Sequence, residues 1–160
     1  MNCGLPNVPD RVSQVISERK QSEKRVEEVE YELARHIAGD IFAKMKAQSG
    51  FFREHVHRTD SSANPLGFLS SIGYAFNDLA TTPYLLVLSS SPVPHNPASL
   101  TVVCVFGSDS EQVKALGNIL KSKLGIKGGG QGSKWSGKMT GIWGNKQDSV
   151  VNEALESDDI

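Results

Sequence analysis

The chain lacks the residues and runs that mark disulfide-rich, exported or membrane-spanning proteins. Its 160 residues include only 2 cysteines, Cys3 and Cys104, with no CxxC pattern, so we expect no disulfide framework and a reducing compartment. No apolar run approaches the roughly 18 residues needed to span a bilayer. The N-terminus lacks a basic region followed by an apolar core, so it predicts no signal peptide. These absences favour a cytoplasmic protein that makes no membrane contact.

Patterns that mark catalysis or metal binding are also missing. No GxSxG, HxxxH or CxxxH occurs, and no pair of carboxylates stands in an apolar setting. The run GGGQGSK resembles a Walker loop, but Ser133 precedes Lys134 where that motif needs glycine. The predicted order around the run is helix, loop, strand, whereas Walker and Rossmann loops follow a strand and open a helix. We therefore expect no enzyme activity, metal or cofactor in this segment.

What the sequence does contain is a long basic stretch. Residues 112–147 include no Asp or Glu, although the whole chain has a formal net charge of −1. Residues 124–145 hold 8 of the chain's 15 glycines and both tryptophans, Trp135 and Trp143. The lysines of the acid-free stretch are Lys114, Lys121, Lys123, Lys127, Lys134, Lys138 and Lys146. Glycine backbone, ammonium groups and aromatic rings together predict a surface for polyphosphate or nucleic acid; the alternative is a flexible hairpin with solvated lysines.

A loop rich in glycine and lysine, over residues 125–144, is the predicted binding site. We expect its lysines to contact phosphates, its glycine amides to surround a phosphate, and Trp135 to stack on an exposed base or ribose. If about four lysines pair with phosphates, affinity should fall on the order of a hundredfold between 50 and 200 mM salt. The predicted RNA-binding residues of this loop are Lys127, Gly128, Gly129, Gly130, Gly132, Lys134, Trp135 and Lys138.

A second basic surface is predicted on a strand that covers residues 51–59. Alternation places Arg53, His55 and His57 on one face and Arg58 on the other. The first face could contact RNA through Arg53 and His55, or it could be the solvated side of an edge strand. A metal would need a third ligand, and the other histidines and cysteines offer no such spacing.

Residues 8–48 predict one long charged helix, which makes up the first of two expected domains, residues 1–48. Pro9 and Asp10 suit its first turn, and its apolar positions recur at intervals of three and four residues. Polar residues interrupt that heptad seam at two positions. We expect the helix, over residues 9–48, to pair with a second copy of the chain or to pack on another part of a longer parent protein.

The second expected domain, residues 49–160, is a small α/β (α+β) unit. Apolar periodicity predicts a strand, a helix, two fully apolar strands, a helix, the glycine loop, a strand over residues 135–143 and a final helix. Asn64 is predicted to cap the first of these helices, and Ser108 with Glu111 to form a capping box on the second. Cys104 falls within an apolar strand and is expected in the core. This order indicates a mixed sheet with helices packed over it.

The start of the long helix and the glycine stretch together resemble a known family. Leu5-Pro-x-x-Pro-Asp-Arg-Val12 and Leu124-Gly-Ile-Lys-Gly-Gly-Gly130 are similar to the C-terminal region of alanyl-tRNA synthetases and of the free-standing alanyl-tRNA editing proteins. The continuation Gly132-Ser-Lys-Trp-Ser-Gly-Lys138 looks closer to the eukaryotic editing proteins. The resemblance covers nearly the whole chain and implies the fold called the DHH-associated domain.

This resemblance implies a role within a longer protein. The chain would be the tRNA-binding or assembly module of a deacylase that hydrolyses serine or glycine mischarged on alanine tRNA, with a zinc-bearing editing domain before Met1. Two alternatives are a dimerisation or interdomain module without RNA contact, and a degenerate DHH-type phosphoesterase-associated domain. DHH phosphoesterases have a histidine after the glycine triplet, where this chain has Gln131, which argues against phosphoesterase activity.

Overall fold

The computed structural model describes residues 8–59, 61–93, 97–158 and 160, and it divides into two units after Leu33. The first helix, α1 (Val8–Ala47), contributes its final turns to the second unit, Ala34–Ile160. The division falls earlier than the predicted one after residue 48, because these turns supply part of the second unit's core. The residues of α1 that are buried there are Ala34, Ile37, Ala38, Ile41 and Met45.

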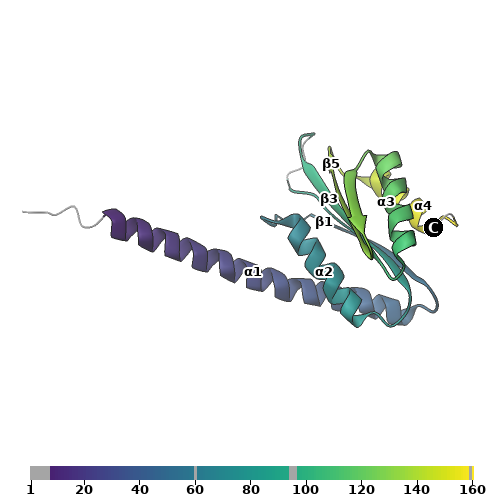
Figure 1. The fold of residues 1–160 in the computed structure, drawn as a ribbon, viewed down its shortest axis with the longest axis horizontal. Coiled ribbons are helices and arrows are strands. Elements are labelled where there is room, and N and C mark those ends of the chain that lie inside the picture. Colours follow the sequence, from purple (N-terminus) through teal and green to yellow (C-terminus); the bar gives the residue numbers. More distant parts are fainter. Residues whose placement is uncertain (1–7, 60, 94–96, 159) are drawn as a thin grey trace, which may run out of the picture. The chain divides into compact units, whose positions relative to one another are not determined.

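A five-stranded mixed sheet forms the middle of the second unit (Figure 1). β1 pairs with β2 in parallel, and every other pairing is antiparallel. The predicted mixed α/β sheet that follows a long helix is confirmed. β1 and β4 are the two edges, about 19 Å apart at four strand spacings. The strands are β1 (Phe52–Arg58), β2 (Tyr84–Ser90), β3 (Leu100–Gly107), β4 (Lys127–Gln131) and β5 (Lys134–Thr140), in the spatial order β1-β2-β3-β5-β4.

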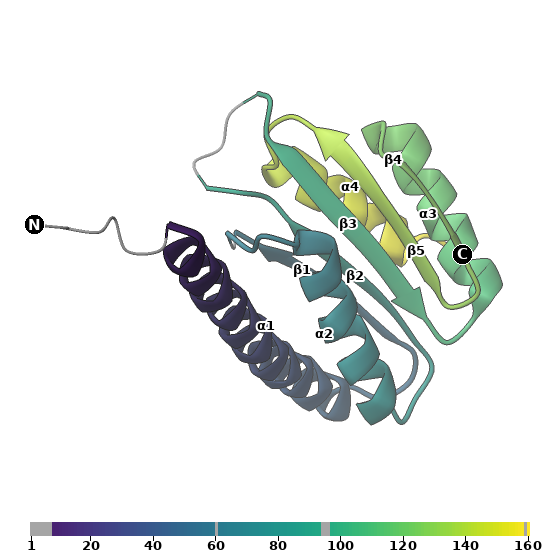
Figure 2. The ribbon, with the colours of Figure 1, turned by 60° about the vertical axis from the view of Figure 1, so that its left-hand side comes forward.

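Helices cover both faces of the sheet (Figure 2). α2 (Pro65–Leu79) and the last turns of α1 pack on one face, while α3 (Ser110–Leu124) and α4 (Asn145–Glu156) pack on the other. β2 and β3 are buried on both faces, as their continuous apolar sequences predicted. Cys104 therefore lies in the core under α2, whereas its neighbour Val103 lies under α3 and α4. We call the two sides the α2 face and the α3 face.

α2 begins as the sequence predicts. Asn64 Oδ1 accepts a hydrogen bond from the backbone N of Gly67 at 3.0 Å, and Pro65 occupies the first helical position, where no N–H is needed. The first turn contains no acidic residue. The positive end of the α2 helix dipole is therefore not compensated by the helix's own side chains.

α3 begins with a different capping group. Asp109 Oδ1 accepts hydrogen bonds from the backbone N of Glu111 at 2.8 Å and of Gln112 at 3.3 Å. The predicted capping box of Ser108 and Glu111 is wrong, because Ser108 Oγ accepts instead from Tyr84 N at 2.9 Å. Two carboxylates, those of Asp109 and Glu111, thus lie at the start of α3.

The glycine stretch, predicted as a loop, forms a hairpin of β4 and β5. Gly132 has a φ of +63° in the turn between them, a conformation that favours glycine. Glycine is required within β4 as well, because a Cβ on Gly128 or Gly130 would collide with backbone atoms of β5. A Cβ on Gly129 would meet nothing within 4 Å. The structure thus adds one strand to the predicted order.

The strand predicted over residues 135–143 is shorter than expected. It ends at Thr140, because Gly141, with a φ of +128°, changes the direction of the chain ahead of α4. Trp143 lies beyond the strand but is 5% exposed and belongs to the core of the α3 face. Trp143 therefore lies on the same side of the sheet as Trp135, as predicted, although it is not part of the strand.

Candidate nucleic-acid interface

A row of residues crosses the α2 face at one level of the sheet. The strand register pairs Arg58 with Ser90, Ser90 with Val102, Val102 with Lys138, and Lys138 with Lys127. Paired residues point to the same face, and neighbouring strands lie about 4.8 Å apart. This cross-sheet row therefore brings one residue from each of the five strands onto one line, and it ends in two lysines at the β4 edge.

Lys127 and Lys138 are directly opposite each other on β4 and β5, and both are exposed. Like charges at opposite positions destabilise a strand pair, by up to about 1 kcal/mol. Neither ammonium group has an ion-pair partner in the part of the chain that the structure describes. A bound anion would replace this repulsion by attraction, so the pair indicates an anion-binding position.

Two adjoining cavities lie beside the cross-sheet row. The larger, of about 640 Å³, is lined by residues 61–66 around the start of α2 and by residues of β2, β3 and β5. The smaller, of about 140 Å³, is lined by residues of β4 and β5. Leu66 and Lys138 belong to both cavities, so the two are parts of one depression, which we call the α2 groove.

The α2 groove is positively charged. Its described lining consists of lysine, serine, asparagine, glycine and apolar residues, with no Asp or Glu among them. The neutral cap Asn64 leaves the positive end of the α2 helix dipole uncompensated, and Lys127 and Lys138 add two full charges. The groove therefore suits an anion such as a phosphate group.

Lys134, the third lysine of the predicted site, is held by α2. Its Nζ donates a hydrogen bond to Ser70 Oγ at 2.7 Å and lies 5.2 Å from the centre of the Tyr74 ring. It also lies 5.7 Å from the Phe106 ring centre. Lys134 is thus a packing contact between β5 and α2.

The nearby Cys104 lies in the core, as the sequence predicted. Burial raises the pKa of its thiol to about 11.

Trp135 points to the opposite face from these lysines. It is 4% exposed and covers Gly117 of α3, where a Cβ would lie only 2.6 Å from the indole ring. A base could not stack on a ring that is buried in this way. The predicted stacking role of Trp135 therefore does not fit this structure.

The glycine backbone also differs from the predicted arrangement. Gly128, Gly129 and Gly130 are extended in β4, so their amides do not form the concave group that a bend would give. β4 is an exposed edge strand, and an edge strand presents a row of N–H and C=O groups outward. Gly132, in the turn, is exposed at the end of the hairpin.

Arg53 and His55 lie far from the hairpin. Both are on β1, at the other edge of the sheet, and they point to the α3 face. The guanidinium of Arg53 lies over the Phe51 ring at 5.1 Å. The His55 side chain is only 5% exposed, so it does not form the open basic surface that alternation predicted. The structure therefore splits the predicted site into two separate places.

The two histidines of β1 belong to a buried polar cluster on the α3 face. His55 Nε2 and His57 Nδ1 lie 3.0 and 2.8 Å from Ser89 Oγ. Trp143 stacks on His57 at 5.1 Å between ring centres, and its Nε1 donates to Asp148 Oδ1 at 2.8 Å. Burial lowers the pKa of His55 to about 4, although the nearby Asp148 carboxylate acts in the opposite direction. The cluster ties α4 to the β1–β2 edge with a neutral His55.

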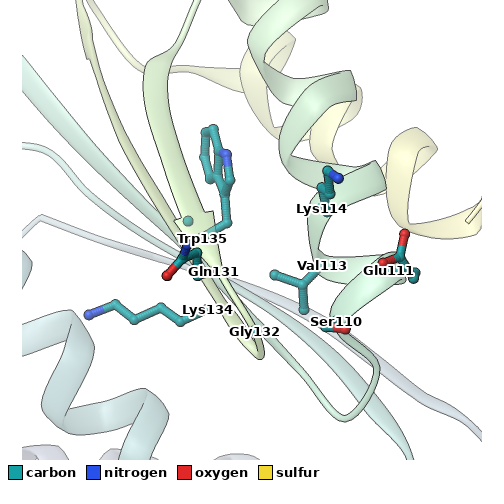
Figure 3. Close-up of a pocket in the computed structure, with 9 residues that line it drawn as sticks. Ser110, Glu111, Val113, Lys114, Gln131, Gly132, Lys134 and Trp135 are labelled. Carbon is teal, nitrogen blue, oxygen red and sulfur yellow. The ribbon is translucent and has the colours of Figure 1, made fainter.

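A further cavity, of about 380 Å³, lies between the start of α3 and the hairpin (Figure 3). Figure 3 shows Lys134 directed away from Lys114, so the two ammonium groups do not converge there. Glu111 lines the cavity, and the Asp109 carboxylate already accepts the first free amides of α3. This cavity therefore suits a phosphate much less well than the α2 groove does.

Sequence reasoning missed several residues of the α2 groove. Asn64 was predicted only as a cap, Leu66 only as part of a helix and Val102 only as part of a strand. Ser90 was predicted in a loop, whereas it is the last residue of β2. Arg58 was placed on the other face of its strand from Arg53, which is correct, but nothing in the sequence said that this face is shared with Lys138. The strand order is the signal that was needed, because it decides which residues meet across the sheet.

Comparison with known proteins adds no family assignment. The chain matches no model of a known protein family and no curated protein sequence. Among the described residues, no three His, Cys, Asp or Glu side chains are grouped so that they could hold a metal ion. A search of the same residues for a membrane-spanning helix also found none of sufficient length and apolarity.

Proposed function

We propose that this chain binds RNA, with its phosphates on Lys127 and Lys138 and along the α2 groove. The observation that carries the proposal is the direct opposition of these two exposed lysines beside a groove whose described lining has no carboxylate. Such an arrangement costs stability in the free protein and is relieved by a polyanion. The exposed main chain of β4 would lie along the same RNA backbone.

The resemblance to alanyl-tRNA editing proteins makes tRNA, and alanine tRNA in particular, the proposed partner. In that case the chain would hold tRNA for a deacylase that acts on mischarged alanine tRNA, and any zinc would belong to the editing domain of the parent. The RNA-binding proposal itself depends only on the groove and its lysines. It can therefore be tested with the chain as it stands.

Binding of a fluorescently labelled alanine tRNA transcript, followed by anisotropy, tests the proposal. With two lysines on phosphates, affinity should fall about tenfold between 50 and 200 mM salt, less than four lysines would give. The double variant Lys127→Ala/Lys138→Ala should lose most of this salt dependence. Lys114→Ala, which removes an exposed lysine of α3, is the matched control and should bind like the wild type.

Two results would contradict the proposal. Binding that does not respond to salt would mean that phosphates are not the main contacts. A loss of affinity in Lys114→Ala as large as that in Lys127→Ala or Lys138→Ala alone would mean that general positive charge, rather than the groove, attracts the tRNA.

An assembly role is a second candidate, and the exposed apolar side chains of α1 favour it. Val12, Val15, Ile16, Val26 and Val29 are 49–63% exposed, and they recur along one helix at the spacing of a heptad seam. A second copy of the chain, or another part of a parent protein, could cover them. Sedimentation equilibrium tests pairing with a second copy. A monomeric mass at high protein concentration would exclude self-association.

A further inference from the structure

Recognition of single-stranded RNA depends on unstacked bases, which need a flat apolar contact and hydrogen-bonding groups at their edges. Trp135 and Trp143 are 4% and 5% exposed on the α3 face and cannot supply that contact. The α2 groove offers an aliphatic surface instead. Leu66, Leu100 and Val102 line its larger cavity, and Leu100 is 46% exposed.

The larger cavity also has the dimensions of a small-molecule site. Its volume of about 640 Å³ lies within the range of roughly 300–1,000 Å³ that is usual for ligand pockets. A single nucleoside fits in such a volume, whereas the smaller cavity, about 140 Å³, does not hold one. A base is therefore expected only in the part of the groove next to α2.

Ser90 provides a buried polar group that faces this cavity. The residue is 2% exposed and lines the cavity, so its hydroxyl is placed to hydrogen-bond with a ligand held there. Asn64 uses its Oδ1 for Gly67 N, which leaves its NH₂ group free to donate to the same ligand.

The cross-sheet row sets the distance between these polar groups and the nearest cation. Ser90 and Lys138 are both paired with Val102, so they lie two strand spacings, about 10 Å, apart. A base near Ser90 and its phosphate near Lys138 can both be reached by one nucleotide. The chemistry of the cavity thus changes from apolar and hydrogen-bonding at one end to cationic at the other.

We infer that the α2 groove takes one unpaired nucleotide of a bound RNA strand. Its base lies against Leu66, Leu100 and Val102 with an edge on Ser90 Oγ, and its phosphate lies on Lys138. This inference rests on the proposed RNA-binding function and adds to it a preference for single-stranded over duplex RNA. Duplex RNA would reach the lysines but could not place a base in the cavity.

Anisotropy with short RNAs tests the inference. A single strand of about 12 nucleotides should bind at least tenfold more tightly than a blunt duplex of the same length at the same salt concentration. Replacing one nucleotide at a time by an abasic residue should weaken binding five- to tenfold at a preferred position. Ser90→Ala and Leu100→Ala should reduce that penalty, whereas Ile142→Ala, at an equally exposed apolar residue outside the groove, should leave it unchanged.

The possible outcomes separate this inference from the proposed function. Salt-dependent binding that is equal for single strand and duplex, with no abasic effect, overturns the inference and leaves RNA binding in place. An abasic penalty that Ser90→Ala and Leu100→Ala do not alter places the base elsewhere and also overturns it. Absence of binding to either RNA removes both the function and the inference.

Discussion

The α2 groove and the cavity at the start of α3 both include residues of the glycine hairpin, but of the two only the α3 cavity has a carboxylate in its described lining. α2 starts with the neutral Asn64 and has no acidic residue in its first turn, whereas α3 starts with Asp109 and Glu111. Lys127 and Lys138 belong to the groove, which leaves the α3 side without a converging pair of lysines. The groove therefore presents its lysines to a polyanion without an opposing carboxylate, whereas Glu111 and Asp109 offset the lysines on the α3 side.

This difference shows how far a local sequence pattern can be trusted. The acid-free stretch begins at Gln112, directly after Glu111. Because the start of α3 lies against the hairpin, the carboxylate of Glu111 returns to the neighbourhood of the glycines. A stretch without acids in the sequence is therefore not a region without acids in space, and only one face of the hairpin remains fully basic.

The largest expected effect tests whether the α3 side of the hairpin is structural. Trp135→Ala should lower the free energy of unfolding by about 3–5 kcal/mol, because the ring fills the core between β5 and α3. Urea unfolding measures this loss, with Ile142→Ala as an exposed control that should change stability by less than about 0.5 kcal/mol. A stable Trp135→Ala variant that fails to bind RNA would instead favour a stacking role.

The buried His55 predicts a dependence of stability on pH. Burial lowers the pKa of His55 to about 4 in the folded protein. Between pH 6.5 and 4, His55 is therefore protonated in the unfolded chain but mostly neutral in the folded one. The stability that the neutral His55 side chain contributes is fully present above pH 6.5. It is lost as the pH falls towards 4, at up to about 1.4 kcal/mol of unfolding free energy per pH unit. Urea unfolding of the wild type and of His55→Gln across this range measures it.

The comparison with His55→Gln isolates this group from the carboxylates that also titrate at low pH. The variant should be less stable at neutral pH but should lose less stability between pH 6.5 and 4. His36→Gln, at an exposed position of α1, should keep the slope of the wild type. Equal slopes for all three proteins would show that His55 is not buried as described.

A smaller effect tests the close approach of β4 to β5. Gly130→Ala should cost about 1–3 kcal/mol, because its Cβ would collide with the backbone of β5. Gly129→Ala, one residue away with open space around its Cβ, should cost less than about 0.5 kcal/mol. Equal effects of the two substitutions would contradict the hairpin and favour the loop that the sequence predicted.

Much of the fold could be predicted from the sequence, because its determinants are local. The apolar runs around Leu86 and Cys104 identified the two central strands, and Asn64 followed by Pro65 identified the start of α2. β4 was missed because a strand of Lys-Gly-Gly-Gly-Gln has neither apolar residues nor alternation. It exists because glycine alone allows such close pairing with β5.

The candidate site was less predictable, because it depends on which residues meet across the sheet. The sequence predicted a site that includes Lys127 and Lys138 and a second basic surface on the strand that forms β1. Their faces and the distance between the two edges follow from the strand order, which no local pattern contains. Trp135 was predicted to bind RNA because aromatic and basic residues are adjacent in the sequence, but alternation along β5 turns them to opposite faces.

Exchanging the caps of α2 and α3 shows at which of the two helix starts RNA binds. Asn64→Asp retains a good cap but adds a carboxylate to the α2 groove, and Asp109→Asn removes one from α3. Asn64→Asp should weaken alanine tRNA binding about tenfold with unchanged stability, and Asp109→Asn should change the affinity less than twofold. A larger effect from Asp109→Asn than from Asn64→Asp would contradict binding in the α2 groove, because the RNA would then bind at the start of α3.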